Sequence, residues 1–400
     1  MRTEELMLKT KCSPKIAVIG CGYVGLPLFI EFSKVLDDVV GFDVDQGRIT
    51  ALRGGGVDCN GEFGDKILLN LTGRLESDAS ELMDRDVYII TVPTPVNENN
   101  KPDLSCLLSA TRLVGEVMKT GTCVVYESTV YPGCIREVCL PLLEQVSGLK
   151  VGSDFLLGFS PERINPGDKQ HTISTIVKVV SGIDEKSLVN ISNLYKLIVR
   201  DVCLSSSIEV AEAAKLLENI QRDVNIALMN EIWSCLTRLD ISTDEVLRVA
   251  STKWNFIKFH PGLVGGHCIA VDPYYLIEKA QEKGIVLPLV KQARVTNESI
   301  IFSLYRRILQ ILQFPYEGKR VLIKGLSFKP NVTDLRNSKV PALKILLEEV
   351  GVLVDVYDPL VSREQAKEAF NIDLSRIEEV SSVDYNLVVS PYDLSITTNP

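Results

Sequence analysis

The first half of the chain alternates short, wholly apolar runs with longer helical stretches. These runs are bounded by turn-forming residues and lie at 16–19, 39–42, 87–90, 123–126, 156–159 and 176–180. Strands that are buried on both faces of a parallel sheet have this uninterrupted apolar character. Because the runs alternate with helical stretches, we predict a doubly wound α/β domain over residues 1–205.

A different pattern begins at Ile208, where apolar residues recur at helical spacing. No proline or glycine occurs between Ile208 and Pro261. This predicts one long helix, a break at 240–243 and then a second helix. We assign residues 206–300 to a central helical domain.

The alternation of strand and helix returns after Lys319. We predict a strand at 320–326, a helix at 340–350 with Gly351 as its C-cap, and strands at 352–357 and 385–389. Residues 301–400 would form a second α/β domain, which we expect to be shortened at its C-terminus. The predicted fold is α/β, with two Rossmann-like doubly wound domains joined by a long central helix and a helical region.

Charge and hydropathy narrow the class of protein. The chain has 43 basic and 52 acidic residues and a net charge of −9, which argues against binding to nucleic acid or to an anionic membrane. It contains no apolar run of about 18 residues that could span a membrane. Acidic residues at Glu4 and Glu5 are unlike the basic start of a signal peptide. We therefore expect a soluble cytoplasmic protein.

The ten cysteines are scattered and form no C-x-x-C pair, and the chain has three histidines. This pattern predicts neither a disulfide framework nor a metal site. We expect most of the cysteines to be small buried hydrophobic side chains and at most one to be chemically active.

The first apolar run leads into a G-x-G-x-x-G motif made by Gly20, Gly22 and Gly25. Such glycines permit a tight turn, close approach of a pyrophosphate and close packing of helix against strand. Asp43 follows Gly25 by 18 residues, where a carboxylate binds a ribose diol and repels a 2′-phosphate. NAD is therefore favoured over NADP, a preference that Arg48 slightly weakens.

Two segments follow predicted strands of the same sheet: Thr91 to Pro95, which includes Pro93 and Thr94, and the pair Ser128 and Thr129. The carboxyl ends of parallel strands are where open α/β sheets bind ligands. The residues alone leave open whether each segment contacts a cofactor or is a rigid turn.

The segment from Pro261 to Pro273 combines three glycines with His267, Cys268 and Asp272. A thiol near a helix N-terminus or a cation has a lowered pKa and can attack a carbonyl carbon. A packed cysteine beside a turn is an equally good interpretation of the spacing. Lys215 and Asn219, four residues apart, would share one helix face and could bind an oxyanion, although such a lysine is more often solvated. Glu162 lies at the end of a predicted strand, and the residues alone do not decide whether its carboxylate has a role in the site.

Seven segments in the same order carry a resemblance to a known family. They are the glycine loop with Asp43 and Arg48, T-V-P-T-P at 91–95, E-S-T-V-Y-P-G at 127–133, S-P-E-R-I-N-P-G-D-K at 160–169, A-E-A-A-K-L-L-E-N at 211–219, G-L-V-G-G-H-C-I-A-V-D-P at 262–273 and F-K-P-N-V-T-D-L-R-N at 328–337. The chain resembles the UDP-glucose/GDP-mannose dehydrogenases. Within them it is most similar to the UDP-N-acetylhexosamine 6-dehydrogenases of Vi-type capsule and O-antigen synthesis.

This resemblance implies oxidation of a sugar C6 alcohol to a carboxylate with two NAD+, through a thiohemiacetal and a thioester on Cys268. It implies that Lys215 and Asn219 stabilise the alkoxide and oxyanion, that Asp272 sets protonation states, and that Glu162 and Thr129 position water. It also implies a UDP-N-acetylhexosamine substrate and a homodimer formed through the central helix.

The resemblance also implies the residues of the binding sites. The implied NAD contacts are Gly20, Gly22, Tyr23, Val24, Gly25, Asp43, Arg48, Thr91, Pro93, Thr94, Ser128, Thr129 and Arg336. The implied substrate contacts are Glu162, Arg163, Asn165, Lys215, Asn219, Arg222, Phe259, Gly265 and Lys329.

Two other functions remain open at this point. One is a two-electron NAD-dependent sugar or hydroxyacid dehydrogenase in which Cys268 is inert and Lys215 is the base. The other is a non-catalytic NAD-binding protein.

Overall fold

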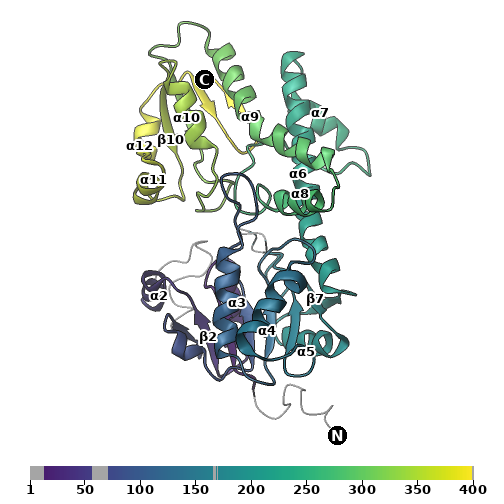
Figure 1. Cartoon of the computed structure of the whole chain (residues 1–400). Coiled ribbons are helices and arrows are strands. Elements are labelled where there is room, and N and C mark those ends of the chain that lie inside the picture. Colours follow the sequence, from purple (N-terminus) through teal and green to yellow (C-terminus); the bar gives the residue numbers. More distant parts are fainter. Residues whose placement is uncertain (1–12, 56–70, 165–167, 169, 399–400) are drawn as a thin grey trace. The chain divides into compact units, whose positions relative to one another are not determined.

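The computed structural model describes residues 13–55, 71–164, 168 and 170–398 (Figure 1). The chain forms two compact units. Unit 1 comprises Met1–Leu217 with Tyr274–Lys279, and unit 2 comprises Glu218–Pro273 with Ala280–Pro400. The three domain ranges drawn from the sequence remain predictions.

Unit 1 is built on an eight-stranded sheet of order β3-β2-β1-β4-β5-β6-β7-β8. Neighbouring strands are parallel except β6 and β7, which are antiparallel. The strands are β1 Ile16–Ile19, β2 Val39–Phe42, β3 Arg74–Glu76, β4 Val87–Ile90, β5 Cys123–Tyr126, β6 Leu156–Phe159, β7 Val177–Gly182 and β8 Asp201–Leu204. The order 3-2-1-4-5-6 is that of a Rossmann fold, which places a ligand-binding crevice beside β1 and β4.

The predicted apolar runs are confirmed as strands, and the last of them is displaced. It covers Val177–Gly182 instead of 176–180. β3 and β8 were not predicted. Both lie at the edges of the sheet, and β8 is mostly exposed. An edge strand does not need the continuous apolar run that identifies a central strand.

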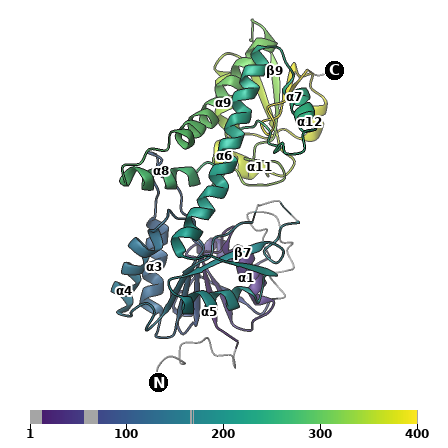
Figure 2. The same cartoon turned by 90° about the vertical axis from the view of Figure 1, so that its right-hand side faces the viewer.

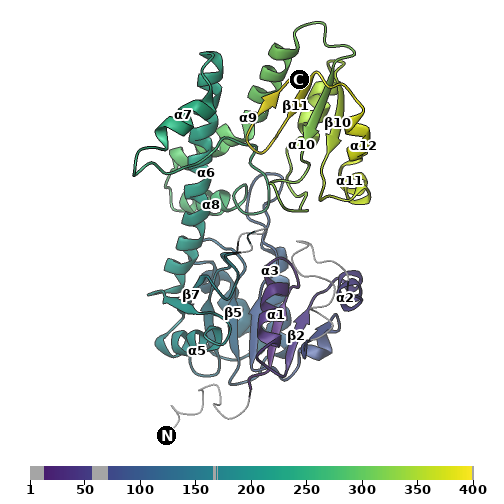
Figure 3. The ribbon, with the colours of Figure 1, turned by 180° about the vertical axis from the view of Figure 1, so that it is seen from behind.

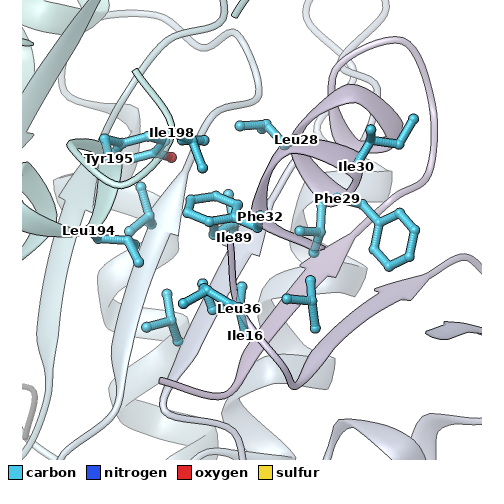
Figure 4. Close-up of a cluster of buried hydrophobic side chains, with 14 of the residues drawn as sticks. Ile16, Leu28, Phe29, Ile30, Phe32, Leu36, Ile89, Leu194, Tyr195 and Ile198 are labelled. Carbon is cyan, nitrogen blue, oxygen red and sulfur yellow. The ribbon is translucent and has the colours of Figure 1, made fainter. Parts of the chain in front are cut away.

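Helices cover both faces of this sheet (Figures 1 and 3). Successive residues of β1 face opposite sides, so Ile16 and Val18 pack with α1 (Gly25–Ser33) and α5 (Glu185–Tyr195), whereas Ala17 and Ile19 pack with α3 and α4. Figure 4 shows the first of these clusters, in which Phe32 of α1 lies 6.1 Å from Tyr195 of α5, measured between ring centroids. The other helices of this unit are α2 Gln46–Arg53, α3 Ser105–Val117 and α4 Leu140–Ser147.

The long helix and its companion are confirmed. α6 spans Ile208–Arg238 without interruption and α7 spans Thr243–Ala250 (Figure 2). Asp240 adopts a left-handed conformation with φ of 54°, and the Ser242 side chain caps α7 by accepting the Glu245 N–H. A polar residue in the left-handed region followed by an N-cap serine produces the predicted break.

Unit 2 contains a four-stranded sheet of order β10-β9-β11-β12, parallel except for β12 (Figure 3). Its strands are β9 Arg320–Lys324, β10 Leu353–Tyr357, β11 Leu387–Val389 and β12 Ile396–Thr397. Its further helices are α8 Asp272–Glu282 (shared with unit 1), α9 Pro288–Leu312, α10 Val340–Glu348, α11 Arg363–Phe370 and α12 Ile377–Ser381. α9 and α10 bury apolar side chains in one core with β9, β10 and β11.

Several predicted boundaries in unit 2 were wrong. β10 begins at Leu353 instead of 352, and β11 begins at Leu387 instead of 385. β9 ends at Lys324 because Gly325 turns the chain with φ of 118°. The C-cap of α10 is Glu349 instead of Gly351. Gly351 lies two residues further on with φ of 88° and donates its N–H to the Glu348 carbonyl at 3.0 Å.

Candidate functional site

The predicted glycine loop has the geometry of a dinucleotide-binding turn. Gly20 has φ of 95°, which favours glycine. A Cβ atom on Gly25 would lie 1.8 Å from the Gly20 carbonyl oxygen and 2.4 Å from Thr91 Oγ1, whereas a Cβ atom on Gly22 would meet nothing within 4 Å. Gly25 is therefore required by packing, and Gly22 faces open space that a pyrophosphate can approach.

Asp43 follows β2 and lies beside this loop. Its Oδ2 accepts the Cys21 N–H at 2.8 Å and its Oδ1 accepts the Asp45 N–H at 3.0 Å. Arg48, on α2, donates its Nε–H to the Cys21 carbonyl at 2.7 Å. Both predicted ribose-site residues are thus fixed to the glycine loop. The carboxylate of Asp43 is half-buried, where it can bind a diol and repel a phosphate.

The segments after β4 and β5 are joined to each other. Thr91 Oγ1 donates to the Gly20 carbonyl at 2.8 Å, and Ser128 Oγ donates to the Val92 carbonyl at 2.6 Å. Thr94 and Thr129 are half-buried and Pro93 is exposed. These predicted residues therefore lie at the carboxyl edge of the sheet, next to the glycine loop. Tyr23 and Val24, also half-buried, complete the turn into α1.

A buried ionic cluster, which was not predicted from the sequence, holds Glu162. Lys178 of β7 donates to Glu127 Oε2 at 2.6 Å and to Glu162 Oε2 at 3.4 Å. Tyr195 donates to Glu127 Oε1. The other oxygen of Glu162 accepts the backbone N–H groups of Arg163 and Ile164. The one available signal was a lysine inside an apolar strand.

Opposing effects set the charges of this cluster. Burial raises the pKa of Glu127 to about 7, although Lys178 opposes the shift. Burial alone would lower the pKa of Lys178, but Glu127 and Glu162 outweigh it and raise that pKa. The lysine is therefore held as an ammonium between two buried carboxylates.

Cys268 lies in the turn that precedes α8 in unit 2. Its carbonyl accepts the Val271 and Asp272 N–H groups at 3.0 and 2.8 Å, and α8 begins at Asp272. The thiol is half-buried. The structure thus places Cys268 beside a helix N-terminus, as predicted for a reactive thiol.

His267 is paired with charged groups. Its Nδ1 lies 2.9 Å from Arg336 Nη2 and 3.4 Å from Asp334 Oδ2. Burial alone would lower the pKa of His267, but Asp334 and Cys268 raise it to about 9. Burial opposes ionisation of Asp334, yet His267 and Arg336 hold its pKa well below the usual range. The sequence singled out Arg336 only as an implied cofactor contact, and it missed Asp334.

Asp272 and Asn219, both singled out in the sequence, are hydrogen-bonded to each other in unit 2. The Asn219 amide donates to Asp272 Oδ2 at 2.5 Å, and Asp272 is buried. Lys215 is half-buried one helical turn earlier on α6.

The remaining predicted substrate contacts differ in their exposure and packing. Arg222 is exposed on α6 and Phe259 is half-buried. Gly265 packs so closely that a Cβ atom would lie 2.6 Å from the Asn337 carbonyl. The ammonium of Lys329 lies 5.7 Å from the centroid of the Phe328 ring. Arg163 donates to the Val177 carbonyl at 3.1 Å, and Asn165 lies outside the described residues.

A buried polar network anchors the Cys268 loop. Asn230 of α6 makes two hydrogen bonds to the backbone of Gly262, at 2.9 and 3.1 Å, and a third to Asn297 at 2.8 Å. Arg294 of α9 bonds Asp223 at 2.5 Å and the Ile269 carbonyl at 3.3 Å. The two ends of the loop are thus tied to α6 and α9 by buried side chains.

The prediction that most cysteines are buried holds only in part. Within the described chain the free cysteines Cys21, Cys123, Cys134 and Cys139 are buried, whereas Cys106, Cys203 and Cys235 are exposed. Over the same residues, no group of three or more His, Cys, Asp or Glu side chains could hold a metal ion. Nor does this part of the chain contain a helix long and apolar enough to cross a membrane.

The glycine loop with the adjacent Asp43 has the geometry of the dinucleotide site of NAD-dependent dehydrogenases. The chain belongs to the UDP-glucose/GDP-mannose dehydrogenase family. The family's NAD binding domain matches residues 14–199 of this chain, its central domain matches residues 209–299, and its UDP binding domain matches residues 322–396. The protein is accordingly an NAD-dependent oxidoreductase.

Named relatives cover nearly the whole chain. It is 46% identical over 381 residues to Protein CapL of Staphylococcus aureus, covering 94% of this chain and 89% of the relative. It is 47% identical over 368 residues to the UDP-N-acetyl-D-glucosamine 6-dehydrogenase of Pseudomonas aeruginosa, covering 90% and 86%. The solved UDP-D-ManNAc dehydrogenase of Pyrococcus horikoshii superposes with a TM-score of 0.83 at 30% identity, covering 96% of each chain.

The glycine loop generates a first prediction. Gly25→Ala forces a Cβ atom against backbone and Thr91, so we expect a loss of stability of about 1–3 kcal/mol or more, measured by chemical unfolding. Gly22→Ala is the control, because its Cβ atom meets nothing, and it should unfold like the wild type. Equal stability of the two variants would contradict this packing account.

The ionic cluster generates a second prediction. Lys178→Met leaves two buried carboxylates without a cation, so we expect a loss of about 3–5 kcal/mol. Since burial raises the pKa of Glu127, the loss should be smaller at pH 5, where Glu127 can be protonated, than at pH 8. Lys150→Met, which removes an exposed pair with Glu144, should cost under about 1 kcal/mol. A pH-independent loss for Lys178→Met would contradict the assigned charges.

Proposed function

We propose that the protein is a UDP-N-acetylglucosamine 6-dehydrogenase that oxidises the C6 alcohol of its substrate to a carboxylate. The observation that carries this proposal is the half-buried Cys268 thiol in the turn before α8, whose first residue, Asp272, donates its N–H to the Cys268 carbonyl. High identity to a named UDP-N-acetyl-D-glucosamine 6-dehydrogenase supports the gluco substrate over its epimers.

The stoichiometry explains why a nucleophile is useful. One alcohol, two NAD+ and one water give one carboxylate, two NADH and three protons. NAD+, when bound at the glycine loop, supplies the hydride acceptor. Cys268 would add to the aldehyde carbon after the first oxidation and would carry the acyl group as a thioester after the second. Covalent attachment retains a reactive intermediate between the two oxidations.

Other residues have assigned parts in this proposal. The Asn219 amide, held by Asp272, and the Lys215 ammonium would stabilise the alkoxide and the oxyanion. Glu162, fixed by Lys178, and Thr129 would position the water that cleaves the thioester. The hydrogen bonds of Asn219 and Glu162 are the support for their two parts.

The binding contacts are also proposals. We assign the sugar nucleotide to Arg163, Asn165, Arg222, Phe259, Gly265 and Lys329, and a cofactor contact to Arg336. The product would be a UDP-N-acetylhexosaminuronic acid. We propose that it serves surface polysaccharide synthesis, for which the similarity to CapL is the support. A cytoplasmic location stays a prediction.

We further propose that the protein is a homodimer formed along α6. Apolar side chains of this helix, including Leu217 and Leu228, are 64% and 52% exposed. They recur at helical spacing with the exposed Ile232 and Leu239, so they form one stripe. A stripe of this kind on one long helix is suited to the same stripe of a second copy.

Product stoichiometry tests the covalent mechanism. We expect two NADH for each UDP-N-acetylglucosamine consumed, measured by absorbance. Cys268→Ser should lower carboxylate formation by roughly three orders of magnitude or more. Cys203→Ser, at an exposed cysteine of β8, is the matched control and should retain full activity.

The outcomes separate the alternatives. A ratio of one, or an active Cys268→Ser variant, would favour a two-electron dehydrogenase. Intact NAD binding without NADH formation from any UDP-sugar would favour a non-catalytic role.

The molecular mass of the protein in solution tests the proposed homodimer. Light scattering during gel filtration should give twice the 44.3 kDa of one chain. Leu228→Asp should shift the protein toward one chain, because it places a charge in the apolar stripe. Ile345→Asp, at an exposed apolar side chain of α10, should leave the mass unchanged. A wild-type monomer would contradict the proposal.

A further inference from the structure

The segment that follows β11 holds the start of the Cys268 loop through its main chain. The Pro391 carbonyl accepts the Leu263 N–H at 3.0 Å. Gly262 packs so closely that a Cβ atom there would lie 2.6 Å from the Tyr392 carbonyl oxygen. Gly262 and Leu263 lead into the segment that carries Cys268. The position of this loop therefore depends on where residues 391 and 392 lie.

The side chain of Tyr392 contacts a second loop of unit 2, which follows β9. A Cβ atom on Gly325 would lie 2.5 Å from the Tyr392 ring, and the Tyr392 hydroxyl oxygen lies 2.8 Å from Ser327 Oγ. Ser327 Oγ in turn donates to the Lys329 carbonyl at 2.8 Å. Because a serine hydroxyl has only one hydrogen, Tyr392 must be the donor to Ser327. Burial raises the pKa of Tyr392, so the phenol keeps the proton that this bond requires.

The turn after β9 repeats the turn after β1 of unit 1. Each begins with a glycine of positive φ. In unit 1, Asp43 follows β2 and accepts the Cys21 N–H at 2.8 Å. In unit 2, Asp358 follows β10 and accepts the Leu326 N–H at 2.8 Å. Unit 2 therefore has the framework of a dinucleotide-binding turn.

What lies over the two turns differs. Two residues after the first glycine, unit 1 has Gly22, which faces open space, and unit 2 has Ser327, which is 3% exposed. The Tyr392 ring covers Gly325, and its hydroxyl oxygen lies 2.8 Å from Ser327 Oγ and 3.5 Å from Asp358 Oδ2. The Tyr392 side chain thus occupies in unit 2 the place that a ligand can enter in unit 1.

The two loops also contact each other directly. The Gly266 N–H donates to the Arg336 carbonyl at 3.1 Å, and the Asn337 side chain donates to the Gly266 carbonyl at 2.9 Å. Gly266 has φ of 80°, and a Cβ atom there would lie 2.7 Å from the Phe328 ring. The loop that carries the thiol and the loop after β9 therefore share one packed arrangement, and Tyr392 contacts both of them.

We propose that Tyr392 is a positioning residue for the sugar nucleotide. Through Ser327 it fixes the Lys329 main chain, and through its own main chain it fixes the start of the Cys268 loop. The substrate-binding ammonium and the thiol are thereby held in one arrangement. An ammonium suits the anionic diphosphate of a sugar nucleotide. This inference rests on the proposed function, which assigns Lys329 to the substrate.

Binding of UDP to the full-length protein tests the inference. Tyr392→Phe removes the hydroxyl and keeps the ring, so Ser327 loses its donor and the Lys329 main chain is less restrained. The Kd for UDP, measured by calorimetry, should rise about fivefold, as expected for the loss of one hydrogen bond. The Kd for NAD+ should not change. Ser327→Ala should weaken UDP binding to the same extent, and the double variant should be no weaker, because both substitutions break one chain of bonds.

Tyr385→Phe is the matched control. Tyr385 precedes β11, is 5% exposed and donates to Asp355 Oδ2 of β10 at 3.0 Å, so this variant loses a comparable bond to a strand instead of to a loop. Its UDP affinity should equal that of the wild type. In hydrogen–deuterium exchange without ligand, the peptide covering 326–329 should exchange about threefold faster in Tyr392→Phe and at the wild-type rate in Tyr385→Phe.

An unchanged Kd for UDP in Tyr392→Phe, or additive losses in the double variant, would overturn the inference. Equal exchange of the 326–329 peptide in Tyr392→Phe and the wild type would do the same. The exchange measurement needs no ligand, so it decides the positioning even for a wild type that binds no UDP. Failure of the proposed function appears separately, as a wild type that binds UDP but forms no NADH from UDP-N-acetylglucosamine.

Discussion

The structure depends on a row of polar side chains buried along α6. Glu212, Asn219, Asp223 and Asn230 recur at helical spacing. Glu212, Asp223 and Asn230 are inaccessible to solvent. A buried polar group costs several kcal/mol unless it is hydrogen-bonded. Each of these side chains must therefore find a partner: Glu212 and Asn230 bond loop backbone at Gly133 and Gly262, and Asp223 bonds Arg294 and Asn297 of α9.

The consequence is that one helix fixes the loops that carry the candidate chemistry. In unit 1, Glu212 accepts the N–H groups of Gly133 and Ile135, just after Thr129. In unit 2, Asn230 holds Gly262, and Asp223 holds Arg294, which reaches Ile269. The thiol and its imidazole are thus carried by a loop that is anchored at both ends. A catalytic loop gains precision from this buried support.

The sequence predicted those features that follow local rules. Continuous apolar runs identified the central strands, and the glycine spacing identified the turn at Gly20–Gly25, because Gly20 has a positive φ and Gly25 has no room for a Cβ atom. It did not predict contacts between distant residues. His267 and Arg336 are 69 residues apart, and Lys178 is 51 residues from Glu127. Nothing in the local pattern of a lysine or an aspartate reveals its partner, so the charges that tune the site became visible only in three dimensions.

The central claim is that the half-oxidised sugar stays bonded to Cys268 between two hydride transfers. Acid quenching of the enzyme during turnover with UDP-N-acetylglucosamine and NAD+, followed by mass spectrometry of the peptide containing Cys268, tests it directly. The account predicts an acyl adduct of the oxidised sugar nucleotide on Cys268 that appears and decays within a turnover. Two NADH formed with no adduct on Cys268, and with free aldehyde in solution, would contradict it.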